Sequence, residues 1–226
     1  MRLVFGNKNY SSWSMRPWVL MRACGIPFTE EKLRLSFAPD SPFKQAVAQV
    51  SGAGKVPVLL LDDGFAVWDT LAIAETLADR FPQAGIWPTD PNHRARARSI
   101  TAEMHSGFSA LRNHCPMNIE ASMPDVGARI WAEQAAVRAD VARIEAIWAD
   151  ALALSGGPFL FGAFGAADAF YAPVVMRLRG YGLPVSAGAQ AYIERVVAHP
   201  AVAAWITDAL AEQDFIAEDE PYRTAR

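Results

Sequence analysis

Ser11-Ser12-Trp13-Ser14 decides the fold, because it lies between a strand-like segment and a helical one. Residues 2–6 alternate as a short strand, and the sequence predicts a helix over residues 15–24 with Ser14 as its N-cap and Pro17 in its first turn. A helix that begins at C-x-x-C is typical of redox domains. Serines occupy both positions here, and hydroxyls form no disulfide, so disulfide exchange at this turn is excluded.

The segments on either side of this turn predict an α/β domain. Their order is β-α-β, a short helix, a β-hairpin turning at Asp62-Asp63-Gly64, and a final helix. That order gives a four-stranded mixed sheet with helices on its faces, which is the thioredoxin-like arrangement. The predicted elements after the first helix are a strand at 28–35, a helix at 41–49, strands at 56–61 and 65–68, and a helix at 69–81.

The character of the sequence changes after residue 81. Prolines and a glycine interrupt any periodic pattern over residues 82–92, which predicts a linker. Helical periodicity then dominates without a convincing strand, so we expect a thioredoxin-like domain over 1–81 and an all-α domain over 93–226. The predicted helices of the second domain are 93–115, 129–154, 168–179, 189–198 and 200–213.

Composition narrows the class of protein. The 226 residues are 52% hydrophobic and 20% charged, which suits a globular chain, and the net charge of −3 argues against a nucleic-acid surface. The two cysteines, Cys24 and Cys115, form no disulfide framework, and residues 1–5 do not resemble a signal peptide. We therefore expect a cytoplasmic protein with a small-molecule partner. The four histidines have no metal-ligand spacing, so no metal is expected.

A serine hydroxyl at a helix N-terminus can stabilise a bound thiolate. Lowering the pKa of a free thiol by about two units takes about 2.7 kcal/mol. One charge-assisted hydrogen bond contributes about 1.5 to 3 kcal/mol and a helix N-terminus about 0.3 to 1. Ser11 and Ser12 precede the predicted helix and can face a ligand. The alternative is that all three serines of the turn serve only as turn and cap residues.

Gly54-Lys55-Val56-Pro57 leads into the predicted third strand. A proline at the start of a buried strand can be cis, and such a bond would turn the Val56 backbone outward to pair with a peptide ligand. Lys55 beside it can meet a terminal carboxylate, although a loop lysine is usually just solvated.

Asp69-Thr70 begins the helix after the hairpin. The Thr70 hydroxyl and the helix N–H groups can hold a carboxylate, and Asp69 can hold an ammonium group. Together they suit an amino-acid head group. The alternative is a simple helix cap.

The order Ser-Ser-x-Ser, Val-Pro, then an acid with a hydroxyl residue resembles the glutathione S-transferases, especially the serine-dependent zeta-like group. The resemblance covers the whole chain, including a proline-containing linker and an all-α second domain. It implies that glutathione is the co-substrate, with its thiol activated by Ser11 and its γ-glutamyl head held by Asp69 and Thr70. The residues implied are Ser11 and Ser12 for catalysis, and Trp13, Lys55, Val56, Pro57, Asp69 and Thr70 for glutathione, with Pro57 cis.

Three departures from the zeta pattern stand out. Trp13 replaces the usual cysteine, and Asp69-Thr70 stands where the family more often has Glu or Gln followed by Ser. Gly165-Ala166-Ala167-Asp168 resembles the helix-capping box of the second domain, with Gly165 in place of Ser or Thr. Glycine is an acceptable N-cap, so folding does not depend on this change.

The second-substrate site is expected between the domains, near Trp13. Met104, His105 and Phe108 share one helical face after the linker, and Arg179 lies one residue from the position of a substrate-binding arginine in zeta enzymes. A Met and aromatic stripe is more often core, and a lone helical histidine is more often structural.

The sequence supports three functions. The first is a glutathione transferase that adds the thiolate to small hydrophobic electrophiles, as in detoxification. The second is a glutathione-dependent cis–trans isomerase of the maleylacetoacetate type, and the third is a glutathione-binding protein without turnover. The resemblance also implies a homodimer. The sequence leaves open which electrophile is used and whether Ser11 or Ser12 is the main thiolate donor.

Overall fold

A computed structural model describes residues 1–226, and its first part is built on a mixed sheet. The strands are β1 (Arg2–Phe5), β2 (Thr29–Lys32), β3 (Val58–Leu60) and β4 (Ala66–Val67), in the order β2-β1-β3-β4. β2 runs parallel to β1, whereas β3 is antiparallel to both β1 and β4. The predicted four-stranded mixed sheet is therefore confirmed, with shorter strands than the sequence pattern indicated.

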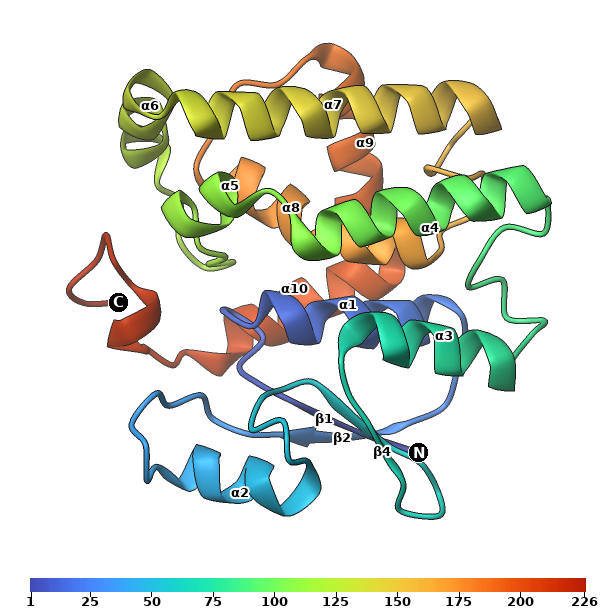
Figure 1. Cartoon of the computed structure of the whole chain (residues 1–226). Helices are drawn as coiled ribbons and strands as arrows, with labels where there is room; N and C mark the ends of the chain where they lie inside the picture. Colours follow the sequence, from blue (N-terminus) through green and yellow to red (C-terminus); the bar gives the residue numbers. More distant parts are fainter.

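Three helices flank the sheet, α1 (Ser12–Ala23), α2 (Pro42–Val50) and α3 (Thr70–Arg80). Figure 1 shows α1 and α3 on one side of the sheet and α2 on the other. This is the thioredoxin-like arrangement expected from the order of elements.

Alternation along β1 explains how the sheet is covered on both faces. Leu3 and Phe5 point into the large core that also contains α1 and α3. Val4 points the other way, where it joins Val58 and Leu60 in a small cluster. The side chain of Val50, at the end of α2, packs against this small cluster.

The rest of the chain is helical, as predicted, and stacks above the sheet domain (Figure 1). None of these helices combines the length and the hydropathy that a membrane-spanning segment requires. The segment between the two parts, residues 81–90, contains neither helix nor strand. The helices are α4 (Pro91–Ser106), α5 (Ser109–His114), α6 (Pro124–Glu133), α7 (Ala135–Ser155), α8 (Ala166–Gly180), α9 (Ala187–Ala198) and α10 (Pro200–Glu212), followed by the 3₁₀ helix η1 (Ala217–Asp219).

Two predicted long helices are each broken in two. Helix 93–115 ends at Gly107, and Phe108 then adopts a left-handed conformation with φ of 56° before α5 begins. Helix 129–154 was expected to be continuous, but Gln134 has non-helical dihedrals between α6 and α7. Periodicity alone does not reveal these breaks, because both halves of each pair keep apolar residues facing the same core.

Helix α1 is buried on all sides. Residues 14–21 are buried without interruption, and α1 packs against α3 in its own domain and against α8 and α10 of the helical domain. One continuous core of 52 buried residues therefore extends through both domains. This packing places the N-terminus of α1 at the boundary between them.

Helix α1 begins earlier than predicted. Its N-cap is Ser11, whose Oγ accepts from the Ser14 N–H at 3.4 Å. Ser14 is fully buried, and its Oγ accepts from the Gly6 N–H at 3.1 Å and from the Ser11 hydroxyl at 2.7 Å. The prediction that Ser14 caps the helix is therefore wrong, because its hydroxyl ties α1 to the loop after β1.

Replacing this cap should cost stability. We expect Ser11→Ala to lower the free energy of unfolding by about 1 kcal/mol, which for a chain of this size lowers Tm by about 2–4 °C. Thermal unfolding followed by circular dichroism measures the shift. Ser99→Ala is the control, because Ser99 is exposed within α4 and bonds only the Ala95 carbonyl. An unchanged Tm in Ser11→Ala would contradict the assignment.

Candidate functional site

Two adjoining cavities open at the N-terminus of α1. The larger, of about 430 Å³, is lined by Ser11, Ser12, Arg112 and Arg177 among others. The smaller, of about 360 Å³, contains the second and third sets of predicted binding residues. Trp13, Lys55 and Val56 line both cavities, so they form the wall between the two. The predicted residues of the smaller cavity are Trp13, Lys55, Val56, Pro57, Asp69 and Thr70.

Ser12 is the serine whose hydroxyl proton is free for a ligand. Its Oγ accepts a hydrogen bond from Arg177 Nη2 at 3.1 Å. A guanidinium only donates, so the Ser12 O–H remains available to donate in turn. Ser11 lines the same cavity, but its O–H is directed at Ser14 Oγ within the cap. The geometry thus favours Ser12 over Ser11 as a donor to a bound anion.

Arg177 lies in the last turn of α8, a helix that is mostly apolar. It is buried in α8, its Nη1 donates to the Cys115 carbonyl, and its Nε has no partner. Burial, followed by the charge of Arg112, lowers the pKa of Arg177 to about 10. Arg177 is not among the residues predicted from the sequence, although a buried charge within a mostly apolar helical run indicates a paired or functional group.

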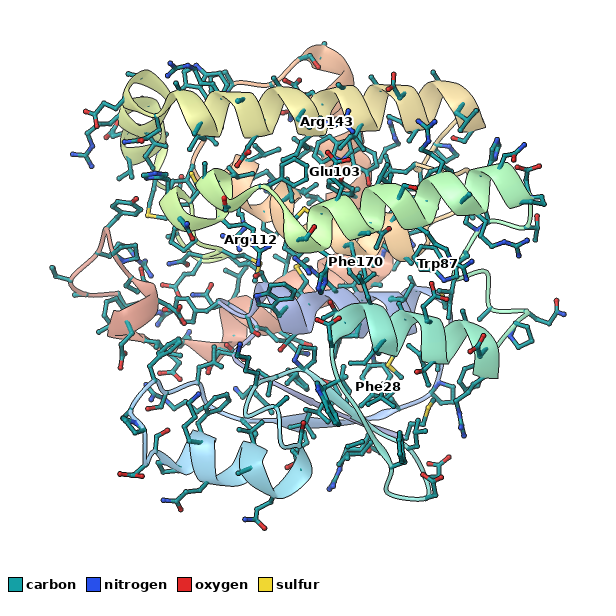
Figure 2. The ribbon with its side chains drawn as sticks, in the orientation of Figure 1. Phe28, Trp87, Glu103, Arg112, Arg143 and Phe170 are labelled. Atoms are coloured by element: carbon teal, nitrogen blue, oxygen red, sulfur yellow. The ribbon has the colours of Figure 1, made fainter.

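Two further arginines surround Trp13. The guanidinium carbon of Arg16 lies 4.1 Å from the centre of the Trp13 ring, and that of Arg112 lies 4.6 Å away. Arg16 is buried with no partner for Nε or Nη1, and burial followed by the charges of Arg112 and Arg177 lowers its pKa to about 9. Figure 2 shows Arg112 at the level between the helical domain and α1. Two guanidinium groups therefore lie against the Trp13 indole, and that of Arg177 bonds the neighbouring Ser12.

Asp69 and Thr70 lie together at the start of α3 and both face His105. Asp69 Oδ1 caps the helix by accepting from the Leu71 N–H at 2.8 Å, while Oδ2 lies 3.3 Å from His105 Nε2. Thr70 Oγ1 lies 3.4 Å from His105 Nδ1. Burial lowers the pKa of His105, and the Asp69 carboxylate opposes that shift. Asp69 therefore does cap α3, as the alternative interpretation predicted, but only through Oδ1. Its Oδ2 points away from the helix, toward His105.

The Val56–Pro57 peptide bond is cis, as the resemblance implied. Val56 lines both cavities beside it. Lys55 is exposed at their shared wall, and Lys44 Nζ approaches the Gly54 carbonyl at 3.4 Å from the larger cavity. Backbone groups and two lysines are therefore available on this side for a peptide with a carboxylate.

The residues expected to hold a second substrate are placed differently. Met104 and Phe108 are buried in the core and line neither cavity. Arg179 is exposed and lies with residues of α9 in another hollow. Positions 177 and 179 point to opposite sides of α8 because successive helical residues turn by about 100°. Of the predicted set only His105 reaches the site, through Asp69 and Thr70.

Other nucleophiles near the site are occupied or buried. Tyr10 lines the larger cavity, but its hydroxyl donates to Glu220 at 2.7 Å, and burial together with Glu220 raises its pKa to about 12. Burial raises the pKa of Cys24 to about 11 and that of Cys115 to about 12. Neither cysteine lines the two cavities. No group of three or more His, Cys, Asp or Glu is placed to hold a metal ion.

Asp219 contributes a carboxylate to the larger cavity from η1. Burial, followed by the charges of Glu218 and Glu220, raises its pKa from 3.8 to about 6 against the opposing charge of Arg177. A carboxyl whose pKa is raised by folding disfavours the folded state wherever it is ionised. The destabilisation is absent below the unfolded pKa and complete above the folded one.

Asp219→Asn should therefore stabilise the protein in a pH-dependent way. We expect a gain of about 1 kcal/mol near pH 7.5, after screening by solvent at this partly buried group, and almost none near pH 4. Urea denaturation at the two pH values measures both effects. An equal change at both values would contradict the raised pKa.

Solved structures share this architecture. A glutathione transferase homologue from Burkholderia with bound glutathione matches with a TM-score of 0.69 and 24% identity over 92% of this chain and 97% of its own. A sphingomonad glutathione S-transferase complexed with glutathione matches with a TM-score of 0.66 and 22% identity over 92% and 98%. At these identities the likeness shows the fold.

Curated relatives match part of the chain. A probable maleylacetoacetate isomerase of Caenorhabditis elegans is 30% identical over 105 residues, which are 46% of this chain and 49% of that protein. The maleylacetoacetate isomerase of Pseudomonas aeruginosa is 35% identical over 66 residues, 29% of this chain and 31% of that protein. The matched regions thus span half or less of the length of these relatives.

Two family models cover most of the chain between them. The glutathione S-transferase N-terminal domain matches residues 10–80, and the glutathione S-transferase C-terminal domain matches residues 120–208. The N-terminal model matches the α/β part of the fold, and the C-terminal model matches the helical part that follows it. The chain therefore belongs to the glutathione S-transferase family.

Proposed function

We propose that the protein is a glutathione S-transferase that activates the thiol of glutathione through the Ser12 hydroxyl. The observation that carries this proposal is the hydrogen bond from Arg177 Nη2 to Ser12 Oγ at the N-terminus of α1. It fixes Ser12 as an acceptor from the protein and leaves its proton for the sulfur. Ser11 supports the same turn as the cap.

Glutathione fits across the two cavities group by group. Its γ-glutamyl ammonium and carboxylate match Asp69 and the helix N-terminus at Thr70, and its cysteinyl backbone matches the Val56 backbone beside cis Pro57. In this arrangement Lys55 binds the terminal carboxylate. The thiol then reaches Ser12 in the larger cavity, past Trp13.

The chemistry needs a thiolate at neutral pH. A shift of about two pKa units requires about 2.7 kcal/mol, which the Ser12 hydrogen bond and the helix N-terminus supply at about 1.5 to 3 and 0.3 to 1 kcal/mol. The thiol proton leaves to solvent. The sulfur lone pair then forms the C–S bond to the electrophile, and the leaving group departs with its bonding electrons or, in an addition, the neighbouring carbon takes up a proton.

Isomerisation is the second candidate function. The maleylacetoacetate isomerase relatives and the Ser-Ser-x-Ser turn favour it, whereas Trp13 in place of cysteine counts against it. In this reaction the thiolate would add to a conjugated double bond and leave again after rotation. Turnover of maleylacetoacetate that depends on glutathione would support this function, and its absence removes it.

Glutathione binding and turnover, measured together, test the proposal. We expect calorimetry to show glutathione binding, and we expect 1-chloro-2,4-dinitrobenzene and a panel of enones to be conjugated faster than in the protein-free reaction. Binding without any acceleration would instead establish a non-catalytic glutathione-binding protein. If glutathione does not bind at all, both the transferase and the non-catalytic glutathione-binding protein are excluded.

We also propose a homodimer, in keeping with the family. Phe65 and Trp68 are 66% and 50% exposed on either side of β4, and Trp68 also lines the smaller cavity. Such exposed aromatic side chains are typical of an association surface. Light scattering after size exclusion gives the mass in solution. The cytoplasmic location expected from the sequence stays a prediction.

A further inference from the structure

His105 connects the two domains at the place where the γ-glutamyl head of glutathione would be held. It lies in the last turn of α4, in the helical domain, whereas Asp69 and Thr70 begin α3 of the sheet domain. Its Nε2 lies 3.3 Å from Asp69 Oδ2, and its Nδ1 lies 3.4 Å from Thr70 Oγ1. One imidazole therefore contacts both side chains assigned to that head group.

The partners of His105 decide which ring nitrogen carries the proton. A neutral imidazole has one N–H donor and one acceptor nitrogen, and a carboxylate only accepts. The proton therefore belongs on Nε2, facing Asp69, and Nδ1 accepts from the Thr70 hydroxyl. With a neutral ring, the charge of the Asp69 carboxylate is not compensated by His105, and the Thr70 oxygen keeps lone pairs. Both can then accept hydrogen bonds from an ammonium group.

Aromatic side chains hold the His105 ring in this orientation. The Trp13 ring meets it edge-on with the ring centres 5.2 Å apart, and the centre of the Phe170 ring lies 6.5 Å away. The His105 carbonyl accepts from Arg112 Nη1 at 3.1 Å, which fixes the backbone of the same residue. The imidazole is thus held toward the start of α3.

The charges that face His105 come from three helices. Asp69 lies on α3, Arg16 on α1 and Arg112 on α5, while α8 contributes only the Phe170 ring. Burial lowers the pKa of His105, the Asp69 carboxylate opposes that shift, and the charges of Arg16 and Arg112 add to it. The ring is therefore neutral at neutral pH and becomes a cation in acid. The cation would donate from both nitrogens, compete for the Asp69 carboxylate and repel a ligand's ammonium group.

We propose that neutral His105 is a positioning residue that makes the head-group site selective for a ligand with a free α-ammonium group, and that protonation of the ring removes this selectivity. The inference rests on the proposed function, because it concerns the glutathione site assigned there. It gives His105 a role toward glutathione in place of the second-substrate role expected from the sequence.

Two ligands that differ only in the ammonium group test the selectivity without requiring turnover. S-methylglutathione and its des-amino analogue, in which a glutaryl group replaces the γ-glutamyl group, are titrated by calorimetry near pH 7. We expect S-methylglutathione to bind about tenfold more tightly, as one charge-assisted hydrogen bond provides. His105→Leu loses both contacts and should reduce this preference to about threefold or less, with the affinity for the des-amino analogue changed by less than about twofold. A merely structural residue would lower both affinities together.

His105→Gln separates the hydrogen bonds of the ring from its titration. The amide offers donors and an acceptor, as the neutral imidazole does, but carries no charge at any pH. We expect this variant to keep the preference of about tenfold both near pH 7 and near pH 5, whereas in the unmodified protein the preference falls about threefold near pH 5. Asp219 lines the larger cavity and also titrates in this range, with a pKa of about 6, but it is present in both proteins and so cannot cause the difference.

His93→Leu is the matched control, because His93 lies in the first turn of the same helix and lines a different cavity. It should keep both the preference and its pH dependence. Equal affinity for the two ligands in the unmodified protein, a preference that survives in His105→Leu, or an equal fall with pH in the unmodified protein and in His105→Gln would each overturn the inference alone. If neither ligand binds, the proposed glutathione site is itself excluded, and the inference with it. A protein that shows the preference but conjugates no electrophile overturns only the transferase function.

Discussion

Ser12→Ala is expected to lower kcat/KM for glutathione conjugation by about 10- to 100-fold, because it removes a hydrogen bond of about 1.5 to 3 kcal/mol to the developing thiolate. The same change leaves Arg177 Nη2 without its hydroxyl acceptor. The pKa of the bound thiol should rise toward the value of free glutathione. The pH dependence of kcat/KM, together with the ultraviolet absorbance of the bound thiolate, measures both effects.

Ser11→Ala provides the comparison that decides between the two serines. The Ser11 hydroxyl is engaged with Ser14, so its loss should destabilise the helix start more than it affects the thiol. We expect a lowered Tm with the pKa of the bound thiol changed by less than in Ser12→Ala. A larger loss of thiolate in Ser11→Ala than in Ser12→Ala would reverse the assignment and restore the order that the resemblance implied.

Gly127→Ala is expected to destabilise the fold by about 3 kcal/mol, the upper end of the usual cost of overpacking. A Cβ at Gly127 in α6 would stand 2.7 Å from the Tyr181 carbonyl carbon, and closer still to its oxygen. Tyr181 is the C-cap of α8, so neither backbone can move without displacing the helix that carries Arg177. The variant should melt about 6–12 °C lower than the parent.

Gly188→Ala is the matched control for this clash. Gly188 also lies in a helix, α9, but a Cβ there would contact nothing within 4 Å. Replacing a helical glycine in open space is expected to stabilise by about 0.5–1 kcal/mol. Opposite signs for the two glycines therefore indicate a steric cause, and similar small effects would show that α6 and α8 can separate without cost.

Local sequence signals predicted the sheet domain well because each element there is short and bounded by turn residues. The helix after Asp69 was predicted in this way, whereas the cis bond before Pro57 was implied by the resemblance. The start of α1 was predicted wrongly, because Ser11 and Ser14 are the same residue type and are equally suitable as N-caps. Only the packing of Ser14 against the loop after β1 distinguishes them.

The prediction of which residues line the second-substrate site missed for a different reason. Met104 and Phe108 have the helical spacing expected of a binding face, but both side chains are buried in the core, and Phe108 lies beyond the end of α4. Arg112 and Arg177 come from separate helices, and no local spacing relates them to Ser12. A site assembled across a domain boundary depends on tertiary packing, which propensity and periodicity do not describe.

The uninterrupted burial of residues 14–21 also means that separating the sheet domain from the helical domain would expose α1. Helix α1 belongs to the sheet domain by chain order, yet it is covered by α8 and α10 from the other domain. The first 81 residues expressed alone would expose that face to water and are unsuited to serve as a free-standing module. We therefore expect the two domains to unfold together, and a chimera that exchanges either domain to need the helix surface that faces α1 as well.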